Sequence, residues 1–226
     1  MTTNNQTILV LANGTVDDVQ VWITLGATPG CIQHVSDLPF VTTIVNDLQG
    51  YFTLKPAQPV FYTPPAGKGL NGNVSFGTPP LNCPTTDWPK GVNVAEFILN
   101  NSFQTGNPQE TIDISAVAGV NAYIKFIMFE GGAWNYGQTD EAGHLKTVTE
   151  FENKGLGDNV GQVGVYPYGC DVCTSSAAPP VCPGPPTPPP HGACQSAAIC
   201  NVQRPASTAG GRVLIRFDGW SKYPRG

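Results

Sequence analysis

Charge is scarce in this sequence: only 12% of its 226 residues are Asp, Glu, Lys or Arg, about half the share usual in soluble domains. The 11 basic residues are scattered and the formal net charge is −5, so the chain lacks the basic surface that nucleic acids and anionic membranes attract. No apolar run approaches the roughly 20 residues that a membrane-spanning helix needs. We therefore expect neither nucleic acid nor membrane as a partner.

Helical periodicity is also missing. No helical face longer than about two turns can be traced, and the chain holds 26 Gly and 22 Pro. Such a composition favours short strands joined by many turns. A chain of this length buries a substantial core, so the sequence predicts an all-β fold with one main domain and an elaboration.

Common catalytic and cofactor motifs are absent. The three histidines, His34, His144 and His191, lie in separate regions, and neither a G-x-S-x-G elbow nor a phosphate-binding loop occurs. The acidic pairs Asp17–Asp18 and Asp140–Glu141 lack the spacing of an EF-hand loop. We expect no cofactor and no metal.

The start of the chain has no leader pattern. Residues 1–5 show neither a basic start nor an apolar core. Seven cysteines are present, however, and five of them lie between Cys170 and Cys200, which favours disulfides in an oxidising compartment. We expect a secreted protein whose leader is not part of this sequence, and a cytoplasmic location stays open.

Several segments alternate as β-strands do. Residues 7–11 and Val19–Leu25 flank the turn signal Asn13–Gly14, which predicts an opening hairpin in which Trp22 fills the core. Residues 147–154 fit a strand or a short helix, and the eight prolines between Pro179 and Pro190 predict an irregular or polyproline-like loop. Further strands are expected at residues 50–56, 59–63, 73–76, 124–129 and 212–217.

Two further β-type runs each carry one carboxylate among apolar or small residues. The first, Asn93–Asn100, contains Glu96, and the second, Glu110–Asn121, contains Asp113. Because strand side chains alternate with period two, Glu96 shares a face with Val94 and Ile98. A carboxylate with so few polar neighbours lies either at the rim of the sheet or paired with another group inside a cleft.

These two runs resemble the signature of thaumatin-like proteins, in which an "AEF-L" strand precedes a "DIS--DGFN-P" segment. The resemblance is strongest over Val94–Phe126, where this chain reads AEFILN and then ETIDISAVAGVNAYIKF. It implies a thaumatin-like β-sandwich formed by residues 1–128 and 205–226, in which the closing strand pairs beside the N-terminus. It also implies an inserted, loop-rich lobe with disulfides at residues 129–204, and a monomer.

The cysteines allow two interpretations. Cys170-x2-Cys173 followed by His191-x2-Cys194 has ligand types and pair spacing that a zinc ribbon accepts. The favoured alternative is a set of disulfides, because Cys182, Pro183 and Cys194 resemble a stretch of the family's second domain whose cysteines are bridged. The resemblance implies the pairs Cys182–Cys194, Cys170 or Cys173 with Cys200, and Cys31–Cys83, and it leaves one thiol over.

The resemblance also points to a carbohydrate site. Thaumatin-like proteins carry an acidic cleft that in some members binds or slowly cuts β-1,3-glucan, and two-carboxylate hydrolysis needs one protonated and one ionised acid. It implies that Glu96 donates the proton and that Asp113 is the base or nucleophile. Aromatic platforms for sugar rings are expected at Trp134, Tyr136 and Tyr168.

Three positions of the family's five-residue cleft set differ here. Asn73 and Gly77 stand where the family shows basic residues, including the cleft Arg, and Ala118 replaces the second Asp. Gln203 and Arg204 replace the third Asp before the last strand. We therefore expect a secreted β-glucan-binding or defence-type protein, with a weak endo-β-1,3-glucanase or a structural or inhibitory module without a sugar site as the alternatives.

Overall fold

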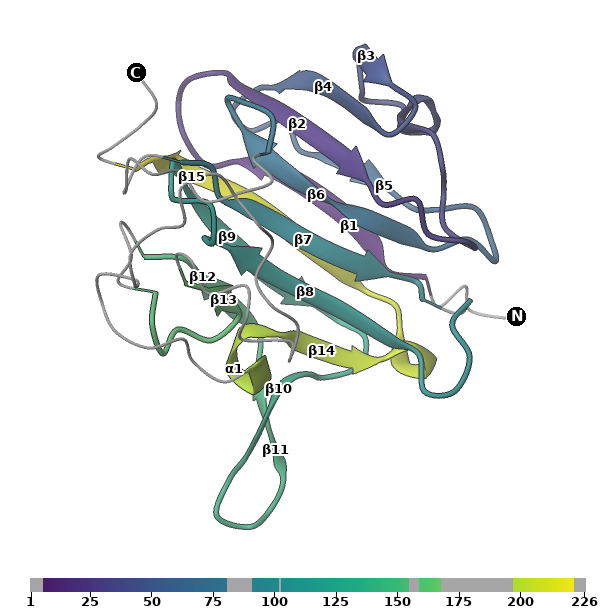
Figure 1. The fold of residues 1–226 in the computed structure, drawn as a ribbon, viewed down its shortest axis with the longest axis vertical. Coiled ribbons are helices and arrows are strands. Elements are labelled where there is room, and N and C mark those ends of the chain that lie inside the picture. The colour runs from purple at the N-terminus through teal and green to yellow at the C-terminus, as the bar shows by residue number, and fades with distance from the viewer. Residues whose placement is uncertain (1–5, 81–90, 102, 155–158, 168–196, 222–226) are drawn as a thin grey trace, which may run out of the picture.

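The computed structural model describes residues 6–80, 91–101, 103–154, 159–167 and 197–221. These residues form an all-β fold of two sheets, one with five strands and one with ten. The sheets are layered against each other (Figure 1). The predicted all-β class is therefore confirmed.

The smaller sheet joins the two ends of the described chain. Its strand β1 pairs in parallel with β15, with Ile8 opposite Arg212 and Asn13 opposite Phe217. The expectation that the closing strand returns beside the N-terminal strand is confirmed. In spatial order the sheet contains β12 (Glu150–Glu152), β9 (Ala122–Phe129), β15 (Arg212–Trp220), β1 (Ile8–Asn13) and β5 (Val60–Tyr62).

The larger sheet contains both predicted carboxylate strands at its centre. Its spatial order is β11 (Leu145–Val148), β10 (Trp134–Thr139), β14 (Val202–Pro205), β8 (Gln109–Ser115), β7 (Val94–Leu99), β6 (Leu70–Phe76), β2 (Val19–Leu25), β4 (Gln49–Leu54) and β3 (Thr43–Asn46). A short strand, β13 (Val165–Tyr166), pairs in parallel with β8.

The predicted opening hairpin is wrong. Strands β1 and β2 have the predicted positions, but β1 lies in the smaller sheet and β2 in the larger one. The turn after Asn13 carries the chain from one sheet to the other, and the Asn13 Nδ2 group donates to the carbonyls of Asp17 and Leu54. β1 is apolar on both faces and lies between β15 and β5, so its neighbours come from distant parts of the chain.

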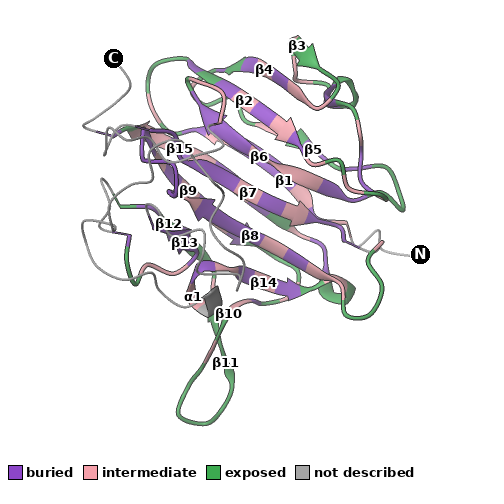
Figure 2. Ribbon diagram, in the orientation of Figure 1, coloured by how far each residue is buried: buried purple, intermediate pink, exposed green. Residues whose placement is uncertain are grey.

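The hydrophobic core lies between the sheets and follows the alternation of each strand. In β2, Val21 and Ile23 are fully buried, and in β15, Val213 and Ile215 are fully buried. The residues between them point to the opposite face, as the period of two requires. Bands of buried and partly exposed residues alternate along the strands in Figure 2.

The segment predicted as an inserted lobe, residues 129–204, contributes to both sheets where it is described. Strands β10, β11, β13 and β14 extend the larger sheet, and β12 is an edge of the smaller one. Residues 147–154 form the end of β11 and then β12, so the strand alternative is the observed one. The Pro-rich residues 179–190 lie outside the described residues, and the division into core and lobe stays a prediction.

Helix is a minor component of the described residues. The α-helix α1 (Ala197–Cys200) has four residues, and short 3-10 turns occur at Val35–Asp37 and Ala206–Thr208. No helix in the described part of the chain is long and apolar enough to cross a membrane.

Candidate functional site

Glu96 and Asp113 lie directly opposite each other on the neighbouring strands β7 and β8. The flanking residues Ala95 and Phe97, and Ile112 and Ile114, belong to the core. Both carboxyl groups therefore lie on the outer face of the larger sheet. Asp113 is only 7% exposed and Glu96 is half-buried, so both acids are largely shielded from solvent although they lie on the outer face.

The pKa values of both acids lie above their ordinary values. Burial, the negative charge of Glu96 and a hydrogen bond to Glu96 raise the pKa of Asp113 well above its ordinary value. Burial also raises the pKa of Glu96, while its hydrogen bond with Asp113 acts in the opposite direction. Asp113 is therefore the protonated member that donates to Glu96, because two carboxylates in contact cannot both ionise.

The roles implied by the resemblance stay a prediction, although the pKa shifts point in the other direction. The resemblance implied that Glu96 gives the proton and that Asp113 is ionised, whereas the pKa of Asp113 is the one held well above its usual range. The hydrogen bond between Glu96 and Asp113 also bears on whether the pair could hydrolyse a glycoside. Glycosidase carboxyls stand about 5–5.5 Å apart in retaining enzymes and about 6.5–9.5 Å apart in inverting ones, so that sugar or water fits between them. A hydrogen-bonded pair leaves no such gap.

Asn73 extends the acid pair onto a third strand. It lies on β6 directly opposite Glu96. The Asn73 Oδ1 and Asp113 Oδ1 atoms are buried, and neither accepts a hydrogen bond from any described residue. A buried acceptor without a donor costs about 1–3 kcal/mol, so two of them on the strands that flank β7 need an explanation.

The row continues across the sheet with uncharged polar side chains. Thr24 on β2 lies opposite Asn73, and Gln49 on β4 lies opposite Thr24. The Gln49 Nε2 group donates to Thr24 Oγ1 at 3.1 Å. We call Gln49, Thr24, Asn73, Glu96 and Asp113 the polar row. It crosses five neighbouring strands of the outer face.

Tyr166 is a neighbour of this row that the sequence did not indicate. It pairs with Ser115 from β13 and is 7% exposed. Burial raises its pKa, and the charges of Asp113 and Glu96 add to this effect. No local pattern could place it here, since β13 has two residues and pairs with a strand about 50 positions earlier.

No cation compensates the acids among the described residues. Neither Glu96 nor Asp113 forms an ion pair there, and the position where the family has its cleft Arg is Asn73. Arg204, which the resemblance aligns with an Asp of the family, is fully buried and lies away from the two acids. Its Nε donates to Glu110 Oε2 at 2.6 Å, and its Nη2 donates to Thr7 Oγ1 at 2.8 Å. This ion pair is part of the core.

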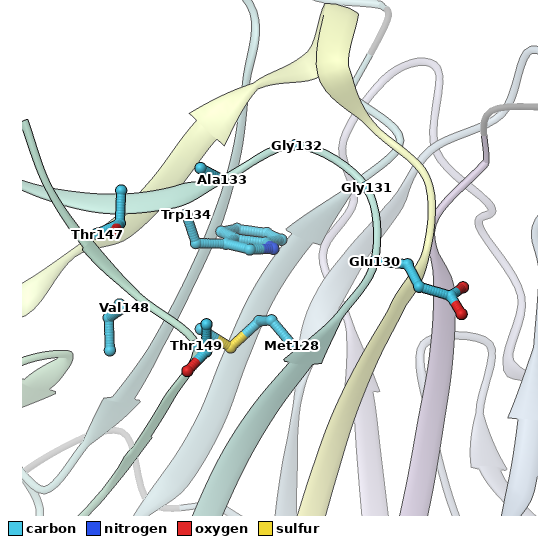
Figure 3. Close-up of a pocket in the computed structure, with 9 residues that line it drawn as sticks. All are labelled: Met128, Glu130, Gly131, Gly132, Ala133, Trp134, Thr147, Val148 and Thr149. Atoms are coloured by element: carbon cyan, nitrogen blue, oxygen red, sulfur yellow. The ribbon is translucent and has the colours of Figure 1, made fainter.

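The predicted sugar platforms in β10 are not open ring faces. Trp134 is 3% exposed, and the Arg204 guanidinium lies 4.4 Å from its ring centroid. Tyr136 is half-buried against the core, and Tyr168 lies outside the described residues. Trp134 does line an open pocket of about 190 Å³ where the chain crosses between the sheets, beside Met128 and Thr147 (Figure 3).

The expectation that Trp22 fills the core is wrong. The sequence placed it in the core, yet the buried residues of β2 are Val19, Val21, Ile23 and Leu25, so Trp22 lies on the outer face. The alternation in the sequence already contained this information, because four aliphatic residues occupy the other face. Trp22 shares the outer face with the polar row.

The described cysteines form no bridge with each other. Cys31 is a free, buried thiol, and burial raises its pKa to about 11. The predicted Cys31–Cys83 bridge is therefore not formed. Cys31 lies within the fold beside Gly69 and is 2% exposed. Cys200 is buried near Val117 and Tyr166. The other predicted disulfide cysteines, Cys170, Cys173, Cys182 and Cys194, lie outside the described residues.

The part of the chain that the structure describes contains no group of three or more His, Cys, Asp or Glu side chains that could hold a metal ion. The zinc-ribbon alternative involves Cys170, Cys173, His191 and Cys194, all outside the described residues.

Comparisons with known proteins identify no family for this chain. No family model matches the chain, and no curated protein matches it. Among solved structures, the chain is similar to the protein elicitor MoHrip2 from Magnaporthe oryzae, with a TM-score of 0.37 and 11% identity over 93% of this chain and 98% of that one. A likeness at this level carries no argument about family or activity.

Proposed function

We propose that this chain is a secreted β-glucan-binding protein of the thaumatin-like kind, and that the ligand lies on the outer face of the larger sheet at Asn73, Glu96 and Asp113. The family part of the proposal rests on the resemblance over Val94–Phe126. The return of β15 beside β1 is in keeping with it.

One observation carries the binding proposal: the acceptors Asn73 Oδ1 and Asp113 Oδ1 are buried without a donor among the described residues, on both sides of the ionised Glu96. A ligand rich in hydroxyl groups supplies the missing donors. A glucan brings many hydroxyls and no charge, so it satisfies these acceptors without adding an ion to a site that is hard to hydrate.

Binding is favoured over hydrolysis. The hydrogen bond between Glu96 and Asp113 holds the acids closer than glycoside hydrolysis requires, and Asp113 retains its proton rather than serving as a base. The alternative, a weak endo-β-1,3-glucanase, requires that the substrate separate the two acids and exchange their roles.

Isothermal titration with laminarihexaose, a soluble β-1,3-glucan fragment, tests the proposal. We expect saturable binding that Glu96→Gln weakens by about tenfold, since hydrogen bonds to a charged group contribute about 1.5–3 kcal/mol. The matched control is Glu152→Gln on β12, which removes a charge from the other sheet and leaves the affinity unchanged.

Two results would decide against the proposal. One is the absence of binding at millimolar ligand, and the other is an equal loss of affinity in Glu96→Gln and Glu152→Gln. A reducing-sugar assay on the same samples separates binding from cleavage. Product release that disappears in Asp113→Asn would favour the glucanase alternative.

A further inference from the structure

Trp22 and Tyr51 form an aromatic pair on the same outer face as the polar row. They lie opposite each other on β2 and β4. Their ring centroids are 4.6 Å apart with planes at 36°. Both side chains are half-buried, so part of the pair stays open to solvent.

The orientation of Trp22 is fixed by a local hydrogen bond. Its indole Nε1 donates to Gln20 Oε1 at 2.9 Å, which satisfies its only donor. With its polar group occupied and one side packed on Tyr51, Trp22 offers apolar ring surface rather than a hydrogen bond. Sugar rings stack on surfaces of this kind, because their C–H faces are apolar.

The aromatic pair is continuous with the unsatisfied acceptors. Trp22 lies opposite Ser75 on β6, and the next outward residues along the same two strands are Thr24 and Asn73. From β2 to the Glu96 strand there are two strand spacings, about 10 Å in total. The path from the aromatic pair to the acids therefore crosses Asn73, whose Oδ1 has no donor among the described residues.

The surface around this path is uncharged. The outward residues of β2 are Gln20, Trp22 and Thr24, and those of β4 are Gln49, Tyr51 and Thr53. A neutral, polar and aromatic surface fits a neutral polyhydroxylated chain. The outward residues of β2 and β4 include no cation to pair with the phosphates of a nucleic acid.

We propose that Trp22 and Tyr51 form a stacking subsite for a sugar ring of the same glucan whose hydroxyls reach Asn73, Glu96 and Asp113. This inference rests on the proposed function and specifies its ligand: an oligosaccharide that runs across the strands and spans both places, rather than one or two sugars. Ring stacking at one end and hydrogen bonding at the other make affinity depend on chain length.

The test compares laminaribiose with laminarihexaose by isothermal titration. We expect Trp22→Ala to weaken laminarihexaose binding by up to about tenfold, in line with the worth of an aromatic contact, and to leave laminaribiose binding unchanged. Trp22→Phe keeps a ring and should restore most of the affinity. The matched control is Phe61→Ala, which removes an exposed ring (54%) from β5 of the other sheet.

The outcomes separate the two proposals. If the unmodified protein does not bind laminarihexaose, the proposed function fails and this subsite fails with it. If laminarihexaose binding is weakened by Glu96→Gln but not by Trp22→Ala, the stacking subsite alone is overturned. Circular dichroism checks folding, and Tyr51→Ala provides a second removal of the platform if Trp22→Ala does not fold.

Discussion

At the scale of single residues, the two acids are unusual because no Lys or Arg in the described part of the chain forms an ion pair with them. Many buried carboxylates pair with Arg or Lys, as Glu110 does with Arg204 in this protein. Asp113 instead faces Glu96 and keeps its proton. With one acid protonated and the other ionised, the pair carries a net charge near −1.

The raised pKa of Asp113 predicts how stability depends on pH. The folded state holds a proton that the unfolded chain releases above about pH 4, the ordinary pKa of Asp. The contribution is fully present below that pH and is lost as pH rises towards the pKa in the folded protein. The free energy of unfolding should fall by up to about 1.4 kcal/mol per pH unit in this window.

Urea denaturation between pH 4 and pH 8 measures this slope. Asp113→Asn keeps a hydrogen-bond donor to Glu96 but does not titrate, so we expect its curve to be flatter. The control is Asp47→Asn, because the Asp47 side chain is 85% exposed. Parallel curves for Asp113→Asn and the unmodified protein would show that Asp113 does not hold the proton.

Some of these residues could be predicted and others could not. Period two placed Glu96 on the face opposite Ala95 and Phe97, and the resemblance brought Asp113 to the same site. The same period placed Trp22 on the face opposite four aliphatic residues. Its outward position could therefore be predicted, although an aromatic residue is often expected in the core. The position of Tyr166 beside the acids could not be predicted, because it lies on a two-residue strand that pairs with a strand far away in the sequence.

At the scale of elements, one buried side chain connects strands from distant parts of the sequence. Arg204 on β14 donates to Glu110 on β8 and to Thr7, and its Nη2 also donates to the Gly210 carbonyl at 2.7 Å. Glu110 Oε1 accepts hydrogen bonds from Thr7 Oγ1 and from the Asn100 backbone N–H. This ion pair therefore connects β8 and β14 with Thr7, Asn100 and Gly210.

Arg204→Met should destabilise the protein by about 3–5 kcal/mol, because it leaves the Glu110 charge buried and unpaired. The double variant Arg204→Met/Glu110→Gln removes that charge and should recover much of the loss. Arg212→Met is the matched control: Arg212 pairs with Glu130 at the surface, where such pairs contribute about 0–1 kcal/mol. Equal urea midpoints for Arg204→Met and Arg212→Met would contradict this account.

Strand positions followed from the sequence more readily than strand partners. Alternation located β2, β7 and β15 because each of these strands must bury one side, which is a local requirement, and an apolar run located β1. Pairing is decided by the whole fold, so the Asn13–Gly14 turn signal suggested a hairpin where the chain in fact changes sheets. The pairing of β1 with β15, about 200 residues away, was available only through the resemblance.

At the scale of the whole molecule, the outer faces of the two sheets differ in kind. The smaller sheet carries charges that are already paired: Lys125 with Glu150 at 2.9 Å and with Glu152 at 3.6 Å, and Arg216 with Asp218. The larger sheet carries unsatisfied acceptors, an acid pair and an aromatic pair. A hydroxyl-rich ligand gains most on the larger sheet, since no existing ion pair has to be broken there.

The central claim is that glucan binds the outer face of the larger sheet, and backbone amide NMR during a laminarihexaose titration tests it most directly. We predict saturable shifts confined to β4, β2, β6, β7 and β8, including the side-chain amide of Asn73, while the amides of β9 and β15 stay in place. Shifts that cluster on β9 and β15, or no shifts at millimolar ligand, would contradict the account.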